Sequence, residues 1–294
     1  MKLQAIAIAI AAARMLAAQT DSGTRGIVPE EVWKARPAAK TAAQAVKPQY
    51  QPAGASPGTS LRPSAPARQV GVTIWRLRAA APGDNGARIL VQQDANTVEW
   101  VPERVSSGSA LKAGDRVRLS IESPDAGYLY VIDRECYATG GRGEPFLIFP
   151  TSRTREGDNR VTGGKVVEIP AQDDRPNFFS LQQSRADQTE EELTVLLTKD
   201  PIGELKIGPK ALRLSEEQVG RWEKQWGAGR VERFELSGGA GKTWTRAEQQ
   251  AGADATRLLT QEDPPPQTVY RVSTAPDQPM MVKVRLRYAA GHKK

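Results

Sequence analysis

From residue 70 onwards, short apolar runs alternate with clusters of Gly, Pro, Asp and Asn, and this pattern restricts the fold more than any other feature of the chain. The runs have the length of strands rather than of helices. No helical pattern of the kind that a parallel α/β sheet needs separates them before residue 200. We therefore expect a mainly β protein, an antiparallel β-sandwich of the immunoglobulin-like class, over residues 70–200. The expected strands are 70–77, 88–91, 98–101, 115–122, 128–133, 146–149, 165–169, 178–181 and 192–198.

Two consecutive runs differ in their hydrophobic pattern. Residues 115–122 alternate, with Val117, Leu119 and Ile121 on one face, which indicates a strand with one solvated face. Residues 128–133 are apolar on both faces, which is typical of a central strand. Because the intervening Ser-Pro-Asp-Ala-Gly is a turn sequence, we expect the two runs to form a hairpin.

The C-terminal third, residues 201–294, mixes helical and strand patterns. Capping signatures at Ser215 and Thr245 predict the starts of two helices. We expect the first helix to end at Gly227 and the second to reach residues 258–259. This mixed α/β extension either completes the sandwich or forms a separate domain. Strands are expected at 231–236, 269–272 and 281–288.

The last of these expected strands alternates apolar and basic residues. Charged side chains, lysine above all, protect an exposed strand edge from pairing with other chains. We therefore expect residues 281–288 to form an edge strand.

Residues 1–18 have the composition of a secretory signal peptide. Lys2 precedes an apolar run at 3–13, and small residues follow, so we expect cleavage after Ala18. Arg14 interrupts the run, which is too short to span a membrane. The alternative is an amphipathic helix buried in the fold. Export predicts a secreted or periplasmic protein, with no stable membrane span after cleavage.

Residues 19–69 are rich in proline and alanine and poor in large apolar side chains. Such a segment buries too little apolar surface to offset its ordering entropy. We expect a disordered linker that is semi-rigid where proline is dense, with a short docking helix around 27–33 as the exception.

Charge and residue usage exclude several classes of function. Residues 1–70 hold 9 Lys and Arg against 3 Asp and Glu, whereas residues 71–294 hold 32 against 31, so the net charge of +7 lies almost wholly in the N-terminal part. The near-neutral remainder argues against nucleic-acid binding. The chain has one cysteine, Cys136, and one histidine, His292, which argues against His/Cys zinc sites, Ser-His-Asp triads and Cys-His dyads. We expect no catalytic residue, metal or cofactor.

One polar loop is a candidate for ligand or partner binding. Residues 153–160 follow an apolar strand and carry arginines whose guanidinium groups can hold a carboxylate or phosphate. An ordinary solvated loop has the same composition. The candidate residues are Arg153, Arg155, Asp158 and Asn159.

Two other motifs have both a functional and a structural interpretation. A Gly-Gly-Ala-Gly-Lys-Thr run at 238–243 resembles a phosphate-binding loop, but Leu236 stands where that loop requires its first glycine, so we interpret the run as a turn. Trp222, Trp226 and Trp244 could form a platform for a carbohydrate or a proline-rich peptide. At helical spacing, Trp222 and Trp226 are more often core residues, so we expect them to lie in the core.

Five stretches between Leu111 and Thr198 resemble the bacterial family named domain of unknown function 4384. The resemblance covers 88 of the 294 residues and consists mostly of core and turn positions, and the insertion at 135–144 departs from it. It implies a secreted or membrane-tethered β-rich module and supplies no catalytic residues. The stretches are LKAGDRVRL at 111–119, AGYLYVI at 126–132, LIFP at 147–150, VEIP at 167–170 and ELTV at 192–195.

Taken together, these features favour an exported, non-enzymatic binding or interaction module of the cell envelope, with an envelope protein or glycan as partner. The alternatives are a carboxylate-based glycan hydrolase and a carbohydrate-binding module. A hydrolase requires a cleft with two carboxyl groups about 5–10 Å apart. A carbohydrate-binding module requires two coplanar aromatic rings on the surface.

Overall fold

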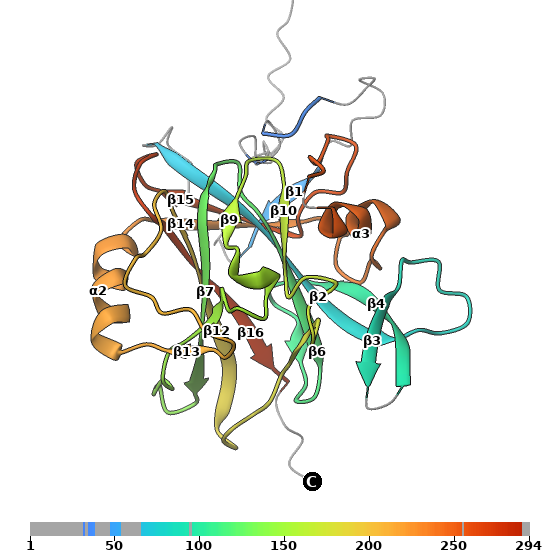
Figure 1. Ribbon diagram of the computed structural model, residues 1–294, viewed down its shortest axis with the longest axis horizontal. Helices are drawn as coiled ribbons and strands as arrows, with labels where there is room; N and C mark the ends of the chain where they lie inside the picture. Colours follow the sequence, from blue (N-terminus) through green and yellow to red (C-terminus); the bar gives the residue numbers. More distant parts are fainter. Residues whose placement is uncertain are drawn as a thin grey trace, which may run out of the picture.

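The computed structural model describes residues 32, 35–38, 48–53, 66–93, 96–254 and 256–289, in which two β-sheets face one another (Figure 1). The first sheet has nine strands in the described residues, and β2 is its centre. One edge of β2 pairs with β15 and then with β4, while the other edge pairs with β6. Its strands are β1 (Tyr50–Pro52), β2 (Ala67–Ala79), β3 (Ile89–Gln93), β4 (Asn96–Val105), β6 (Arg116–Glu122), β10 (Val166–Ile169), β11 (Phe179–Ser180), β14 (Val231–Leu236) and β15 (Thr268–Ser273).

The second sheet has the order β13-β8-β7-β12-β16-β5, with β9 paired to β7. Its pairings are antiparallel except for the short contact between β16 and β5. Its strands are β5 (Ala110–Leu111), β7 (Gly127–Tyr137), β8 (Phe146–Phe149), β9 (Arg160–Val161), β12 (Gln188–Thr198), β13 (Leu212–Arg213) and β16 (Met280–Tyr288).

The main core lies between the two sheets. Alternate residues of β2 and β6, such as Ile74 and Leu119, meet alternate residues of β7 and β12, such as Val131 and Val195. Period-two alternation places these side chains on the inner face of each sheet. The prediction of a mainly β, antiparallel sandwich is confirmed.

Segments outside residues 70–200 also belong to the sandwich. β14 and β15 extend the first sheet and β16 extends the second, so the C-terminal extension completes the same fold. Within the segment that composition predicts to be a linker, Tyr50 is buried in β1, which pairs with β14. Of the expected docking helix, Val32 is described, and it is helical and buried. The expected signal peptide, residues 1–18, lies outside the described residues.

The expected hairpin of residues 115–122 and 128–133 is wrong. β7 is a central strand, but it lies in the second sheet, whereas β6 pairs with β2, β10 and β11 in the first. The turn between them therefore crosses from one sheet to the other. The outer face of β6 is not solvated either, since Arg118 and Glu122 are both buried there.

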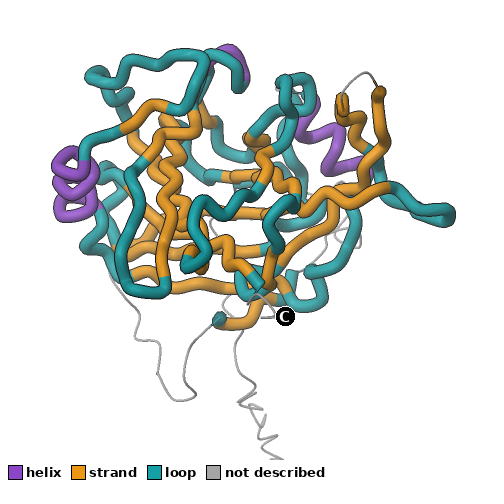
Figure 2. Tube along the Cα trace, turned by 90° about the horizontal axis from the view of Figure 1, so that it is seen from below, coloured by secondary structure: helices purple, strands orange, loops and turns teal. Residues whose placement is uncertain are grey.

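Two helices pack on opposite sides of the sandwich, α2 (Glu216–Trp226) on the second sheet and α3 (Arg246–Ala253) on the first (Figure 2). Both begin at the predicted caps, where the Ser215 hydroxyl accepts from Gln218 N and Thr245 forms a full capping box with Glu248. α3 ends five residues earlier than expected, because Asp254 adopts an extended conformation. No helix in the described part of the chain is both long and apolar enough to cross a membrane.

β16 is close to the edge of its sheet rather than at it. It pairs with β12 over eight residues, and Arg287 and Tyr288 pair with β5 on its other side. Its outward basic residues contact acidic side chains of β12: Lys283 lies 3.0 Å from Glu192, and Arg285 lies 3.3 Å from Glu190. Cross-strand charge pairing therefore accounts for the basic alternation.

Candidate functional site

The four candidate residues of the loop at 153–160 make separate contacts. Asn159 has a structural role, because its Nδ2 donates to Leu129 O at 3.0 Å. Asp158 is engaged by Arg160 at 2.8 Å, and this exposed ion pair holds the pKa of the Asp158 carboxyl below its ordinary value. Arg153 is exposed, and its guanidinium has no partner among the described residues.

Arg155 begins an unusual turn in this loop. Arg155 and Glu156 have φ values of 49° and 55°, and Gly157 follows in the same left-handed region. Non-glycine residues rarely adopt this region, and such strain is often found at binding sites. Arg155 N donates to the buried Asp174 carboxylate at 3.0 Å, and this hydrogen bond holds the turn against the segment that contains Asp174. The loop has an unusual backbone geometry, but its residues line neither the groove beside α2 nor the cavity under α3.

A surface groove beside α2 is large enough for a ligand. Its volume of about 510 Å³ falls in the range of small-ligand and peptide sites. We call it the α2 groove. It is lined by Thr198, Lys199, Asp200, Pro201, Ile202, Glu204, Arg221, Trp222, Gln225, Trp226, Asp277 and Pro279.

The pairing of β12 with β16 brings the walls of the α2 groove together. Leu197 at the end of β12 is opposite Met280 at the start of β16, so the loop after β12 and the loop before β16 emerge side by side. The first loop is held by a hydrogen bond of 2.8 Å from Ile202 N to the Tyr130 hydroxyl. Strands and a helix thus position the groove, as in most pre-formed binding sites.

A pair of stacked tryptophans lines the groove. The rings of Trp222 and Trp226 lie 5.7 Å apart at an interplanar angle of 17°. Trp222 is buried in a cluster with Val219 and Leu214, whereas Trp226 is half-buried. The core interpretation therefore holds for Trp222. Because one ring covers the other, the pair is not the flat two-ring platform that a carbohydrate-binding module requires.

Charged side chains of both signs surround these aromatic rings. Lys199 and Arg221 are cationic, and Asp200, Glu204 and Asp277 are anionic. The helical spacing of Trp222 and Trp226 makes the α2 side of the groove recognisable in the sequence. The loop residues carry no such signal, because they come from segments that only folding brings together.

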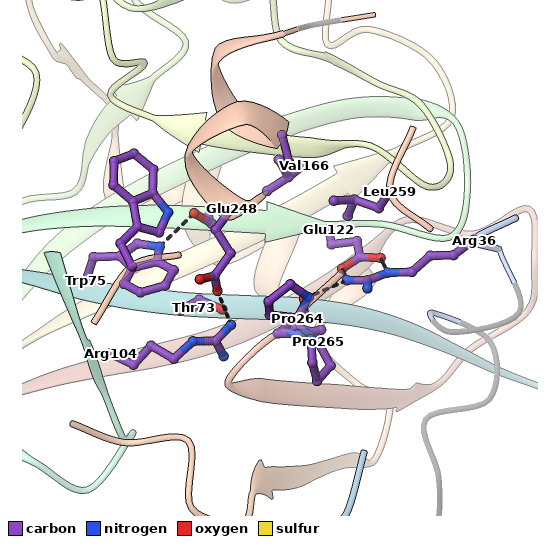
Figure 3. A pocket seen from close by; sticks show the side chains of 14 residues that line it. Arg36, Thr73, Trp75, Arg104, Glu122, Val166, Glu248, Leu259, Pro264 and Pro265 are labelled. Carbon is purple, nitrogen blue, oxygen red and sulfur yellow. Dashed lines mark hydrogen bonds and ion pairs between the residues drawn. The ribbon is translucent and has the colours of Figure 1, made fainter. Parts of the chain in front are cut away.

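A second, smaller cavity lies under α3 on the outer face of the first sheet. Its volume of about 40 Å³ suits water rather than an organic ligand. Figure 3 shows two Arg–Glu pairs at its wall, Arg36 with Glu122 and Arg104 with Glu248. The Gly-rich run at 238–243 lies beside it, and Arg104 O accepts from Gly241 N at 2.9 Å. That run is a turn bound to β4, not a phosphate-binding loop.

Folding also brings carboxyl groups together near one end of the second sheet. Asp133 and Glu191 are both largely buried, and each has one carboxyl oxygen without a hydrogen-bond partner among the described residues. Burial raises the pKa of Asp133 to about 6 and that of Glu191 to about 8, and the proximity of the two charges adds to the rise at Glu191. Neither residue lines the α2 groove or the cavity under α3. Among the described residues, no three His, Cys, Asp or Glu side chains form a group that could hold a metal ion.

A family model described as "Domain of unknown function (DUF4384)" matches residues 110–201, in agreement with the resemblance seen in the sequence. The match covers 92 of the 294 residues, from β5 to the loop after β12. It therefore includes only residues 198–201 of the α2 groove, while Ile202, Glu204, α2 and the loop before β16 lie outside it. No curated protein and no solved structure matches the chain.

Proposed function

We propose that the chain is an exported, non-enzymatic β-sandwich binding module, and that the α2 groove holds an extended peptide segment of an envelope protein. The observation that carries this proposal is the groove itself, an open hollow of about 510 Å³ with aromatic and proline side chains and a charged rim. Export is supported by the signal-like composition of residues 1–18.

The lining of the groove suits a peptide. Trp226, Ile202 and the two prolines offer apolar surface to side chains, and proline-rich extended segments dock against aromatic-lined grooves of this kind. The lining includes both cationic and anionic side chains, which complements a segment that carries both charges. A glycan would require exposed coplanar rings, which the stacked Trp222 and Trp226 do not provide.

Selection of peptides on the immobilised chain, residues 19–294, tests the proposal. A displayed library of proline-containing peptides is selected against the wild type and against Trp226→Ala. We expect sequences that bind the wild type and are lost with Trp226→Ala. Leu258→Ala is the matched control, because Leu258 is a 44%-exposed apolar residue that does not line the groove. A glycan array probed in parallel reports carbohydrate binding, which would contradict the peptide proposal if it alone gave a signal.

Glycan hydrolysis is a second candidate function, although Asp133 and Glu191 line neither the α2 groove nor the cavity under α3. The neighbouring carboxyl groups of Asp133 and Glu191, with pKa values raised by burial, have the chemistry of an acid–base pair. Release of reducing ends from envelope glycans by the wild type, and its loss in Asp133→Asn, would support this function. Without such release, the pair has a structural role alone.

A further inference from the structure

The Arg36 side chain occupies a pocket whose acceptors match a guanidinium group. Arg36 Nε and Nη2 each donate to one oxygen of Glu122 at 2.7 Å (Figure 3). Nη1 donates to the carbonyl oxygens of Asp263 and Thr260 at 2.8 and 3.3 Å, and Nη2 donates also to that of Pro264 at 3.2 Å. We call this set of acceptors, the Glu122 carboxylate and the three carbonyl groups, the guanidinium slot.

The slot provides an acceptor for each of the five N–H donors of arginine. A lysine has three donors and no planar fork, so it cannot satisfy this arrangement. The side chains of Arg36 and Glu122 are 1% and 4% exposed, so water contributes little to either charge. A buried pair of this kind is stable only when its geometry is satisfied in full.

The acceptors of the slot are also held by contacts that do not involve Arg36. Glu122 ends β6, where its backbone register is fixed against Gly71 and Val166. The carbonyl groups belong to a turn in which Asp263 accepts from Thr260 N at 2.7 Å and from Arg257 at 2.6 Å. None of these contacts uses the Arg36 side chain, so we expect them to remain when the guanidinium group is removed.

Arg36 also supplies most of the polar attachment of its own segment. Among the described residues 35–38, the backbone adds one hydrogen bond between main-chain groups, from Gln261 N to Pro37 O at 3.1 Å. Within the strap, Ala35 is half-buried and Pro37 and Ala38 are exposed, so these small side chains add little apolar burial. The guanidinium group is therefore the anchor of this strap.

We propose that the guanidinium slot is a receptor for an arginine side chain, filled in this protein by Arg36 of the strap 35–38. The slot binds the guanidinium group itself, so the covalent link to the strap is not needed for recognition. The strap therefore occupies the slot reversibly, and removal of the Arg36 side chain leaves a site that a guanidinium ion can fill. This proposal is independent of the α2 groove.

Chemical rescue of Arg36→Gly in the 19–294 chain tests the proposal. The probe is low-millimolar guanidinium chloride, far below denaturing concentrations. We expect the variant to unfold at a lower temperature than the wild type and to regain several degrees with guanidinium, while the wild type does not respond. Sodium chloride at equal ionic strength and methylammonium chloride, which mimics lysine, should have no such effect.

Arg36→Gly/Glu122→Gln is the matched control, because it removes both buried charges and keeps the cavity. It should not respond to guanidinium. If Arg36→Gly alone is unfolded, recovery of its near-UV circular dichroism on adding guanidinium is the same positive result. Absence of any response, or equal responses to guanidinium and methylammonium, would overturn the proposal.

Discussion

Gly252 of α3 lies directly on the carboxyl group of Glu168 in β10. A Cβ atom at position 252 would come within 2.0 Å of Glu168 Cδ. Glycine at this point lets the helix approach the sheet and cover the buried ion pair of Glu168 with Arg118, whose charged atoms lie 2.8 Å apart. Helix α3 therefore packs closely against the Glu168 carboxyl group on the outer face of the first sheet.

Gly252→Ala should therefore destabilise the protein, although alanine normally favours a helix. Overpacking costs about 1–3 kcal/mol, more than the roughly 0.5–1 kcal/mol that alanine contributes in a helix interior. Gly220→Ala in α2 is the matched control, because no atom lies within 4 Å of a Cβ there, and it should stabilise. Urea unfolding of both variants measures the difference. Equal effects would contradict the close packing of α3 on Glu168.

Arg118→Ala should destabilise in a pH-dependent manner. It leaves Glu168 buried without its partner, at a cost of about 3–5 kcal/mol when Glu168 is charged. Burial already raises the pKa of Glu168 to about 7, so at pH 5 the carboxyl group is neutral in the folded state and the loss is smaller. Urea midpoints of variant and wild type at pH 5 and pH 8 measure this difference. The exposed pair of Arg160 with Asp158 provides the control, since Arg160→Ala should leave the midpoint unchanged at either pH.

Asp133 and Glu191 should make the protein less stable as the pH rises. Their folded pKa values, about 6 and about 8, lie above the ordinary carboxyl range, so the folded state holds protons that the unfolded chain releases. The stabilisation is complete below about pH 4 and is lost as the pH rises through 6 to 8. The double variant Asp133→Asn/Glu191→Gln should reduce the loss of stability with rising pH. Titration of Glu168 accounts for the pH dependence that remains. An unchanged slope in thermal midpoints across this range would exclude the pair as its source.

Local signals in the sequence predict local structure well. The Thr245 and Glu248 side chains form the capping box that their spacing indicates, because both partners lie within one helical turn. Strand positions follow from period-two alternation in the same way. Alternation does not reveal the sheet to which a strand belongs. β6 and β7 have the sequence pattern of a hairpin, but they lie in different sheets and face one another across the core.

Contacts between distant residues account for what the sequence leaves open. Composition predicts a linker up to residue 69, but Arg36 meets Glu122 from 86 residues away, and no local pattern marks that pair. In the α2 groove, Trp222 and Trp226 are visible as a helical face. Lys199 and Asp277 join them because β12 pairs with β16, which no local pattern reveals.

The binding site should depend on the indole ring of Trp226. Truncation of an aromatic residue at the centre of a binding site typically costs more than 1.4 kcal/mol, which is a tenfold loss of affinity. The most direct measurement is calorimetric titration of one selected peptide into the wild type, Trp226→Ala and Leu258→Ala. The account predicts that Trp226→Ala binds at least about tenfold more weakly, while Leu258→Ala matches the wild type. Equal affinity of Trp226→Ala and wild type, or no peptide binding to the wild type, would contradict the assignment of the α2 groove as the binding site.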